Sequence, residues 1–257
     1  MQLLRNLYSY RELLKSNVKK EIRGKYKGSF LGILWSFLNP LLQVAVYAIV
    51  FPYIMRIETP NYLQYLIVGI IPWTFFITVI NQGMIAVRMN AGIIKKVYFP
   101  REILPISVAI SGLVNFFISC IIILIFCIFG GLGISWHLIL LPVIALIQFV
   151  FTLGLVLALS AINIFIKDTE YIVQFIINML FYATPILYPA SLFPEKIRWV
   201  LYLNPLTGII DAYRGIFMYH QMPNVASFIY LVVIAVIVFL LGLAIFRKLE
   251  KGFAEEL

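Results

Sequence analysis

Apolar residues fill most of the chain in long runs that short polar breaks separate. A helix needs roughly 20 apolar residues to cross about 30 Å of hydrocarbon, and six runs approach or exceed that length. They cover residues 29–55, 62–84, 104–129, 137–166, 171–188 and 225–246. The pattern predicts an all-α integral membrane protein with six transmembrane helices, folded as a single transmembrane domain over residues 1–257.

The first 28 residues follow a different pattern, in which charged positions surround a helical apolar stripe. Six apolar residues recur at spacings of three or four, which places them on one face of a helix: Leu3, Leu7, Tyr10, Leu14, Val18 and Ile22. Segment 1–28 is therefore predicted to be an amphipathic interface helix on the cytoplasmic membrane surface, where anionic headgroups attract its basic residues.

Segment 189–222 is too apolar for a solvated loop and too broken for a membrane span. Prolines interrupt the helical pattern in and around it, at Pro185, Pro189, Pro194, Pro205 and Pro223. We expect short re-entrant helices here, between the fifth and sixth spans, with their backbone covered by neighbouring helices.

Composition and charge placement agree with a membrane protein. Of the 257 residues, 63% are hydrophobic and 12% are charged, whereas soluble domains carry about 25% charged residues. Sixteen of the 20 Lys and Arg residues fall in segments 1–28, 85–103 and 247–257 or in the turn at 167–170. The positive-inside rule then places these segments and both termini in the cytoplasm. Basic clusters that punctuate apolar runs also exclude a nucleic-acid-binding face.

The sequence lacks several motifs that carry chemistry, and their absence further limits the class of membrane protein. It contains no G-x-x-x-x-G-K-[ST] loop for ATP phosphates and no His, Cys, Asp and Glu set with metal-ligand spacing. No acidic residue lies in the middle of a predicted span, although ion-coupled carriers usually require one. We therefore expect no catalytic residue, no metal site and no cofactor bound by this chain.

Two groups of residues are candidates for contact with a transported molecule. Asp211 and Arg214 would share one helix face and neutralise each other, or Arg214 would meet an anionic substrate group near the outer exit. The aromatic residues Trp35, Trp73, Phe75 and Phe76 either pack between helices or line a path for the substrate.

Three stretches of sequence carry a resemblance to a known family. They are IRGKYKGSFLGILW (22–35), which leads to Asn39 and Pro40, VGIIPWTFF (68–76) and KKVYFPREILP (95–105). Asn163, Lys167–Asp168, Thr184–Pro185 and Asn204–Pro205 follow in order, although the family often has Arg at position 167. The chain resembles the permeases of ABC-2 type exporters for O-antigen, capsule and teichoic-acid polymers.

The resemblance implies an ATP-driven exporter in which a separate subunit binds ATP and Mg. It implies a homodimer of this chain with two copies of that cytoplasmic ATPase subunit. The substrate would be a polysaccharide carried on a polyprenyl diphosphate lipid. The location would be the cytoplasmic (inner or plasma) membrane of a bacterium or archaeon.

Roles for particular residues follow from this picture. In the cytoplasmic loop 85–103, the tip formed by Val97, Tyr98, Phe99, Pro100 and Arg101 would dock into the ATPase subunit, because aromatic residues and Arg are typical binding anchors. The same loop could instead lie against lipid headgroups.

At the predicted gate, Arg23 and Lys25 would pair with the lipid diphosphate. Tyr26 and Trp35 would contact the first sugars.

Other classes remain open on sequence grounds. An ABC-2 permease for a drug or a simple lipid would share the architecture but usually lacks the 97–105 pattern. A membrane enzyme acting on lipid-linked sugars would need paired carboxylates near an interface, and Asp168 and Glu170 lie in a short cytoplasmic turn. The third class that remains open is an assembly scaffold with no transport role.

Overall fold

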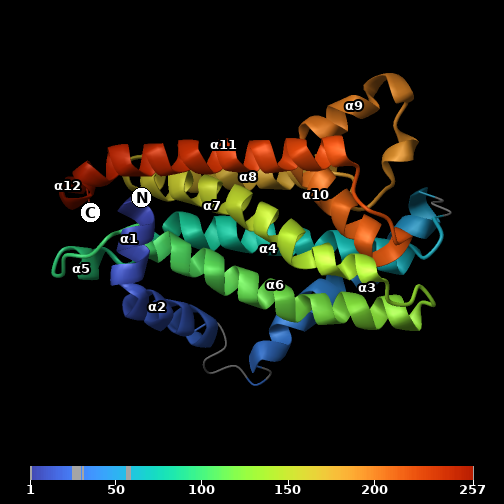
Figure 1. The fold of residues 1–257 in the computed structure, drawn as a ribbon, viewed down its shortest axis with the longest axis horizontal. Coiled ribbons are helices and arrows are strands. Elements are labelled where there is room, and N and C mark those ends of the chain that lie inside the picture. Colours follow the sequence, from blue (N-terminus) through green and yellow to red (C-terminus); the bar gives the residue numbers. More distant parts are fainter. Residues whose placement is uncertain (1, 25–29, 31, 56–58, 257) are drawn as a thin grey trace.

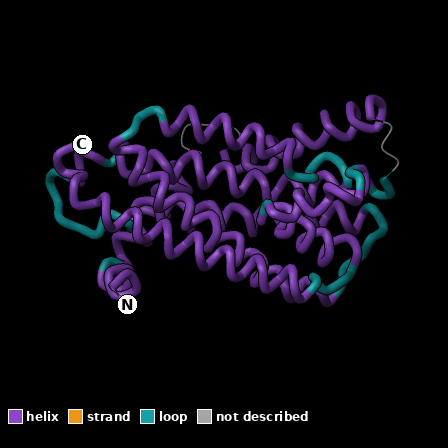
Figure 2. The backbone as a smooth tube through the Cα atoms, turned by 90° about the horizontal axis from the view of Figure 1, so that it is seen from above, coloured by secondary structure: helices purple, strands orange, loops and turns teal. Residues whose placement is uncertain are grey.

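The computed structural model describes residues 2–24, 30, 32–55 and 59–256, which form helices and loops without a strand. The long helices run side by side along the long axis of the molecule, and both termini lie at one end (Figure 1; Figure 2). The bundle helices are α3 (Trp35–Met55), α4 (Tyr62–Met89), α6 (Ile103–Phe129), α7 (Leu141–Phe165), α8 (Thr169–Ala183) and α11 (Val225–Leu249).

Four helical stretches among the described residues are long and apolar enough to cross a membrane. They are Tyr62–Met89, Ile103–Phe129, Trp136–Phe165 and Val225–Gly252. The chain is therefore a multi-pass membrane protein. In α3 the apolar part is Leu38–Pro52, and the 15 residues of α8 extend about 22 Å. Six complete spans stay a prediction.

Several helix ends differ from the predicted span boundaries, among them those of α4 and α8. Helix α4 continues to Met89 instead of ending at residue 84, because 85–89 contain no helix breaker. Helix α8 ends at Ala183 instead of residue 188. The cause is Pro185, since the residue before a proline is held out of the helical region, and Thr184 has a ψ of 133°.

Helix α4 lies at the centre of the bundle. In its most apolar stretch 78% of the residues are buried inside the protein, compared with 17% in Val225–Gly252. Helices α3, α6, α7 and α10 (Pro205–Arg214) pack around it. Side chains of α4 therefore meet protein on most sides and contribute to the buried arginine network and the polar cavity described below.

Helices α7 and α11 pack backbone to backbone. A Cβ atom added to Gly242 would lie 1.9 Å from the carbonyl oxygen of Gly154, and one added to Gly154 would lie 2.6 Å from the backbone of Phe239. Small residues allow this close approach in membranes, where van der Waals packing drives association. Among the described residues, this pair also makes the most extensive contact between two helices.

Two short helices occupy the proline-rich segment between α8 and α11. Helix α9 (Glu195–Leu203) projects from the bundle (Figure 1), after a 3-10 turn, η3 (Ala190–Leu192). Helix α10 is mostly buried, and a π-helical turn, η4 (Gly215–Tyr219), continues it. Asn204 caps α10 through its Oδ1, which accepts from the Leu206 N–H at 3.1 Å. Short helices are present here as predicted, whereas their re-entry into the membrane stays a prediction.

The N-terminal segment forms two helices instead of one. Helix α1 (Gln2–Ser9) and helix α2 (Arg11–Gly24) meet at Tyr10, and α2 packs against α6. The remaining short elements are η1 (Gly32–Leu34), α5 (Ala91–Ile94), η2 (Trp136–Leu140), η5 (Glu250–Gly252) and α12 (Phe253–Glu256).

Candidate functional site

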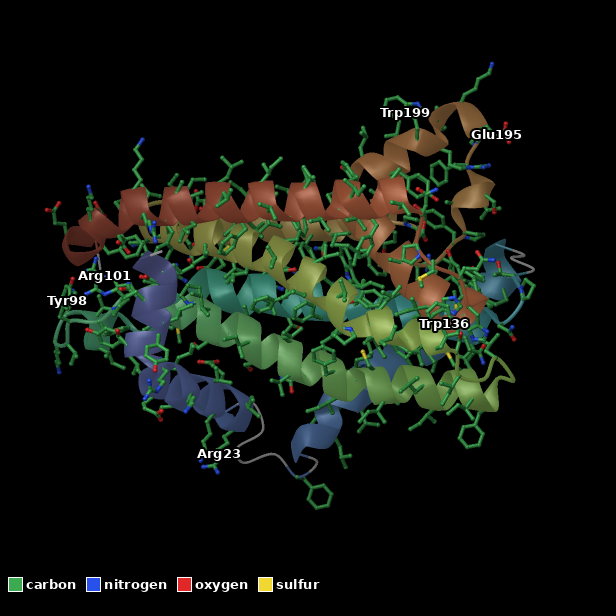
Figure 3. All side chains as sticks on the ribbon, in the orientation of Figure 1. Arg23, Tyr98, Arg101, Trp136, Glu195 and Trp199 are labelled. Atoms are coloured by element: carbon green, nitrogen blue, oxygen red, sulfur yellow. The ribbon has the colours of Figure 1, made fainter. Side chains whose placement is uncertain are left out.

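The loop between α4 and α6 has an exposed tip and a buried root. Val97 is 57% exposed and Tyr98 is 92% exposed, whereas Phe99 is only 7% exposed. Tyr98 and Arg101 lie at the end of the bundle that carries both termini, opposite Trp136 and Glu195 (Figure 3). The predicted docking motif therefore has an exposed part and a buried part. Val97 and Tyr98 are the residues most available to a partner.

Arg101 holds the root of this loop to the C-terminal segment. Its Nη1 donates to the Glu250 carbonyl oxygen, and its guanidinium lies 5.7 Å from the ring centroid of Phe253. Phe253 is fully buried, with the rings of Phe165 and Phe246 at 6.2 and 5.5 Å. Arg101 is partly exposed and bonds within the chain in this structure, and its role in docking stays a prediction.

Phe253 is not among the functional residues predicted from the sequence. Its only signal was an isolated aromatic residue in the charged tail KGFAEEL (251–257). A second tie at the loop root joins the buried Glu102 to α1, because Asn6 Nδ2 donates to Glu102 Oε1 at 2.9 Å.

A polar cluster also joins the start of the loop to α7 and α8. Arg88, at the end of α4, forms an ion pair with Glu170 of α8. Asn163 of α7 donates through Nδ2 to Glu170 Oε1 at 3.0 Å and to the Met84 carbonyl oxygen at 3.4 Å. Movement of the loop would therefore be transmitted to α4, α7 and α8.

The predicted lipid-diphosphate gate is described only in part. Arg23 is exposed at the end of α2, and Lys25 and Tyr26 lie outside the described residues. Beside Arg23, an apolar cavity of about 440 Å³ separates α2 from α6, and Lys15 and Lys19 also line it. Pairing of these residues with a diphosphate stays a prediction.

On the exposed side of α2, Lys15 donates to Glu12 at 2.9 Å. This hydrogen bond, together with the charge of Lys15, lowers the pKa of the Glu12 carboxyl.

The four aromatic residues predicted to line a path occupy two environments. Trp35 and Phe75 line a cavity of about 380 Å³ between α3, α4 and α6. Trp73 and Phe76 are buried, at 4% and 3% exposed, and their rings pack against each other at 5.6 Å. Trp73 and Phe76 are core residues in this structure.

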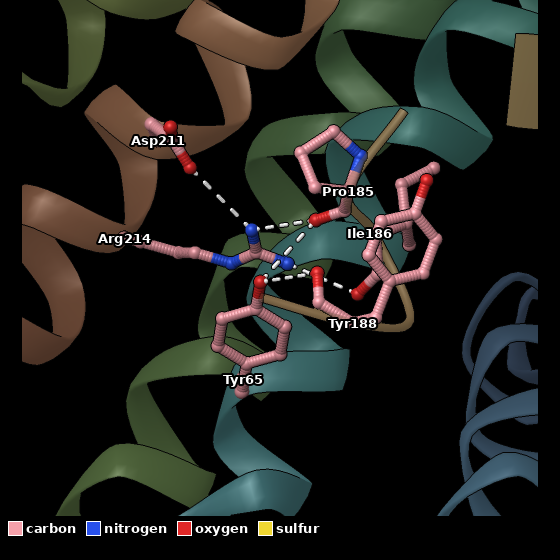
Figure 4. A network of polar contacts seen from close by, with 6 residues as sticks. All are labelled: Tyr65, Pro185, Ile186, Tyr188, Asp211 and Arg214. Carbon is pink, nitrogen blue, oxygen red and sulfur yellow. Dashed lines mark hydrogen bonds and ion pairs between the residues drawn. The ribbon is translucent and has the colours of Figure 1, made fainter. Parts of the chain in front are cut away.

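Arg214 is the centre of a buried polar network near the N-terminal end of α4 (Figure 4). The side chain is 1% exposed. Its Nη1 donates to the Pro185 carbonyl oxygen at 2.8 Å, and its Nη2 donates to the Ile186 carbonyl oxygen at 3.0 Å. Asp211 Oδ1 lies 3.5 Å from Nη1.

The Tyr65 ring completes the network, with its centroid 3.5 Å from the guanidinium carbon of Arg214. The Tyr65 hydroxyl donates to the Tyr188 carbonyl oxygen at 2.9 Å. The predicted pairing of Asp211 with Arg214 is present in this structure. Arg214 joins the segment after α8 to α10, and its side chain is almost fully buried. Its contact with a substrate stays a prediction.

The architecture and the sequence together define a class of membrane transport protein. The ABC-2 type transporter family model matches residues 12–218, and the chain belongs to this family.

Two named relatives match the chain over nearly its whole length. It is 37% identical to the O-antigen export system permease protein RfbA of Myxococcus xanthus, with 100% of both chains covered. It is 37% identical over 246 residues to the protein of the same name from Klebsiella pneumoniae, covering 95% of this chain and 94% of the relative.

The polysialic acid transport protein KpsM of Escherichia coli is a more distant relative. It is 23% identical over 243 residues, which cover 91% of this chain and 92% of the relative.

Proposed function

We propose that this chain is the membrane-spanning permease subunit of an ATP-driven exporter of polysaccharide. The observation that carries the proposal is the 37% identity, over the full length of both chains, to a permease named for O-antigen export. The exposed Val97–Tyr98 tip supports it, because a permease without an ATP site needs a surface on which an ATPase subunit can act.

The proposed assembly is a homodimer of this chain with two copies of an ATPase subunit that holds ATP and Mg. Helices α3 and α8 complete six spans, so that both termini and the loop 85–103 face the cytoplasm of a bacterium or archaeon. The placement of sixteen of the 20 basic residues in the segments assigned to that side supports this orientation. The substrate is a polymer on a polyprenyl diphosphate lipid.

In the proposed mechanism, closure of the ATPase subunits moves the loop tip, and the root of the loop transmits that movement. Arg101 passes it to Phe253 and hence to α7 and α11, while Arg88 passes it through Glu170 to α8. The lipid diphosphate is collected beside Arg23 and Lys25.

Transport by the purified complex tests the function. The chain is reconstituted in vesicles with its ATPase subunit and with lipid-linked polymer loaded on the ATPase side. We expect ATP-dependent movement of the polymer to the opposite side. ATP-dependent movement of a drug or of a simple lipid, without movement of the polymer, would replace the proposal by the second type of ABC-2 permease.

Two neighbouring substitutions test the loop. Tyr98→Ala removes an exposed side chain, so we expect loss of ATPase-subunit binding with unchanged thermal stability. Phe99→Ala removes a buried ring and should destabilise the permease by about 3 kcal/mol. Tyr8→Ala, at an exposed tyrosine of α1 that is 73% exposed, is the control. Normal binding by Tyr98→Ala would reject the tip as the docking surface.

A pair of truncations tests the role of Phe253. A chain that stops after Ala254 keeps this ring, and a chain that stops after Gly252 loses it. We expect the shorter chain to retain the ATPase subunit and ATP hydrolysis but to move less polymer per ATP. Equal transport per ATP by the two truncated chains would contradict the relay through Phe253.

A further inference from the structure

Two polar stripes meet in the cavity between α3, α4 and α6. Thr74, Thr78 and Gln82 recur at every fourth position of α4, and Ser111, Asn115 and Ser119 do the same on α6. Residues four apart share one face of a helix, and all six side chains line the same cavity of about 380 Å³. Asn39 of α3 adds a further amide. The helices that carry these stripes are two of the four apolar enough to span a membrane.

The stripes do not satisfy each other's hydrogen-bonding groups. Among the hydrogen bonds of the described residues, none joins a side chain of the α4 stripe to one of the α6 stripe. Ser119 bonds to the Asn115 carbonyl oxygen of its own helix. Ser111 is 7% exposed and makes no side-chain hydrogen bond to another described residue, and Asn115 Oδ1 is buried without a partner in the same part of the chain.

Gln148 and Thr152, two polar residues buried elsewhere in the bundle, do have hydrogen-bond partners. Gln148 donates to the Pro72 carbonyl oxygen at 2.8 Å and accepts from the Tyr213 hydroxyl at 3.0 Å. Thr152 donates to the Gln148 carbonyl oxygen at 2.7 Å. Polar groups at membrane depth are costly unless they are paired or line a filled or hydrated cavity. Apart from Ser119, the stripe side chains have no hydrogen-bond partner among the described residues, which indicates a cavity that receives a hydrogen-bonding guest.

The lining defines the chemistry of that guest. None of the described residues that line the cavity carries a charge, so the site does not match an ion or a phosphate. Hydroxyl and amide groups supply both donors and acceptors. Phe75 and Phe116 provide apolar faces, and Trp35, which is 40% exposed, stands at the rim. A neutral molecule with many hydroxyl groups and apolar ring faces, a saccharide, fits this combination.

We propose that the polar cavity between α3, α4 and α6 is a saccharide-contact site along the path of the exported polymer, a proposal that rests on the proposed function. The volume of about 380 Å³ lies at the lower end of the roughly 300–1,000 Å³ typical of small-ligand sites. The site therefore holds a short segment of the polymer at a time. Uncharged contacts would hold each segment weakly enough for it to move on.

Thiol labelling tests the site without requiring transport. Thr78→Cys and Asn115→Cys are treated with a water-soluble, positively charged methanethiosulfonate, in vesicles and with the ATPase subunit present. Wild-type protein gives the background, because Cys120 and Cys127 are 3% and 1% exposed. Ile121→Cys, at an outward position of α6 that is 55% exposed, is the control for a lipid-facing position.

We expect both cavity cysteines to react and the polysaccharide released from the producing cells by mild acid to slow that reaction about tenfold. The reaction of the control should not change. A dry, unreactive cavity or labelling unaffected by the polysaccharide would overturn the proposal. Equal protection by vesicles that contain polyprenyl phosphate without sugar would also overturn it, because the guest would then be a lipid.

Transport by isosteric variants separates this proposal from the proposed function. Thr78→Val and Ser111→Ala remove hydroxyl groups that we assign to sugar contacts, and together they should lower polymer transport about five- to tenfold while ATP hydrolysis continues. Thr152→Val is the matched control, because its hydroxyl bonds within the bundle. If the wild type transports polymer and the double variant transports it equally well, the saccharide site is rejected and the proposed function stands. Absence of wild-type transport would reject the proposed function, while the labelling result would still decide whether the cavity binds saccharide.

Discussion

The Arg214 network and the polar cavity place hydrogen-bonding groups inside the same apolar bundle in opposite ways. Around Arg214, both terminal nitrogens donate to carbonyl oxygens and the guanidinium covers a tyrosine ring, although Nε has no partner among the described residues. In the cavity, Ser111 and the Asn115 amide oxygen have no partner within the described part of the chain. Paired groups fix one conformation, whereas unpaired groups leave room for a molecule that binds and departs. The paired groups stabilise the fold of this permease, whereas the unpaired groups are available to bind the transported molecule.

The largest effect should come from removing the charge at the centre of the network. Arg214→Leu leaves two carbonyl oxygens and the partly exposed Asp211 without their partner, and each hydrogen bond to a charged group contributes about 1.5–3 kcal/mol. We expect a much lower unfolding temperature in detergent. Arg198→Leu is the control, because that side chain lies on the projecting helix α9 and bonds the Phe193 carbonyl oxygen at 3.2 Å. Equal unfolding temperatures for the two variants would break the comparison.

A smaller effect is expected at the ring that lies against Arg214. Tyr65→Phe keeps the aromatic face but removes the hydroxyl that bonds the Tyr188 carbonyl oxygen at 2.9 Å. The free energy of unfolding should fall by about 1–2 kcal/mol, measured by thermal unfolding in detergent. Tyr62→Phe offers a matched control, since its hydroxyl bonds the Leu187 carbonyl oxygen at 2.8 Å from a less buried position. A larger loss in the control would show that burial does not set the strength of these bonds.

The smallest effect on stability should come from the cavity. Thr78→Val removes a hydroxyl without a hydrogen bond in the described structure, so the free energy of unfolding should change by no more than about 0.5 kcal/mol. Thr152→Val removes a hydroxyl that bonds at 2.7 Å and should cost about 1 kcal/mol. If Thr78→Val destabilises the protein more than Thr152→Val does, the cavity is part of the scaffold and the contrast fails.

Hydropathy predicted the membrane class and four of the long helices because those properties depend on local composition alone. The exposure of Tyr98 was also predictable, since it stands between short basic and proline-containing segments. The inward roles of Phe99, Arg101 and Phe253 were not, because each depends on contact with residues distant in sequence. The spacing of Thr74 and Thr78 was visible in the sequence, but only packing shows that their face meets the α6 stripe instead of lipid.

The glycine contact between α7 and α11 has a consequence for how the protein can move. With the backbone of Gly242 against that of Gly154, a slide of one helix along the other would drive larger side chains into the backbone. The two helices are therefore expected to move together as one rigid body. A conformational change that opens a path must then occur elsewhere in the bundle. We expect it at the ends of α3 and α8, because these helices are shorter and have prolines within or beside them.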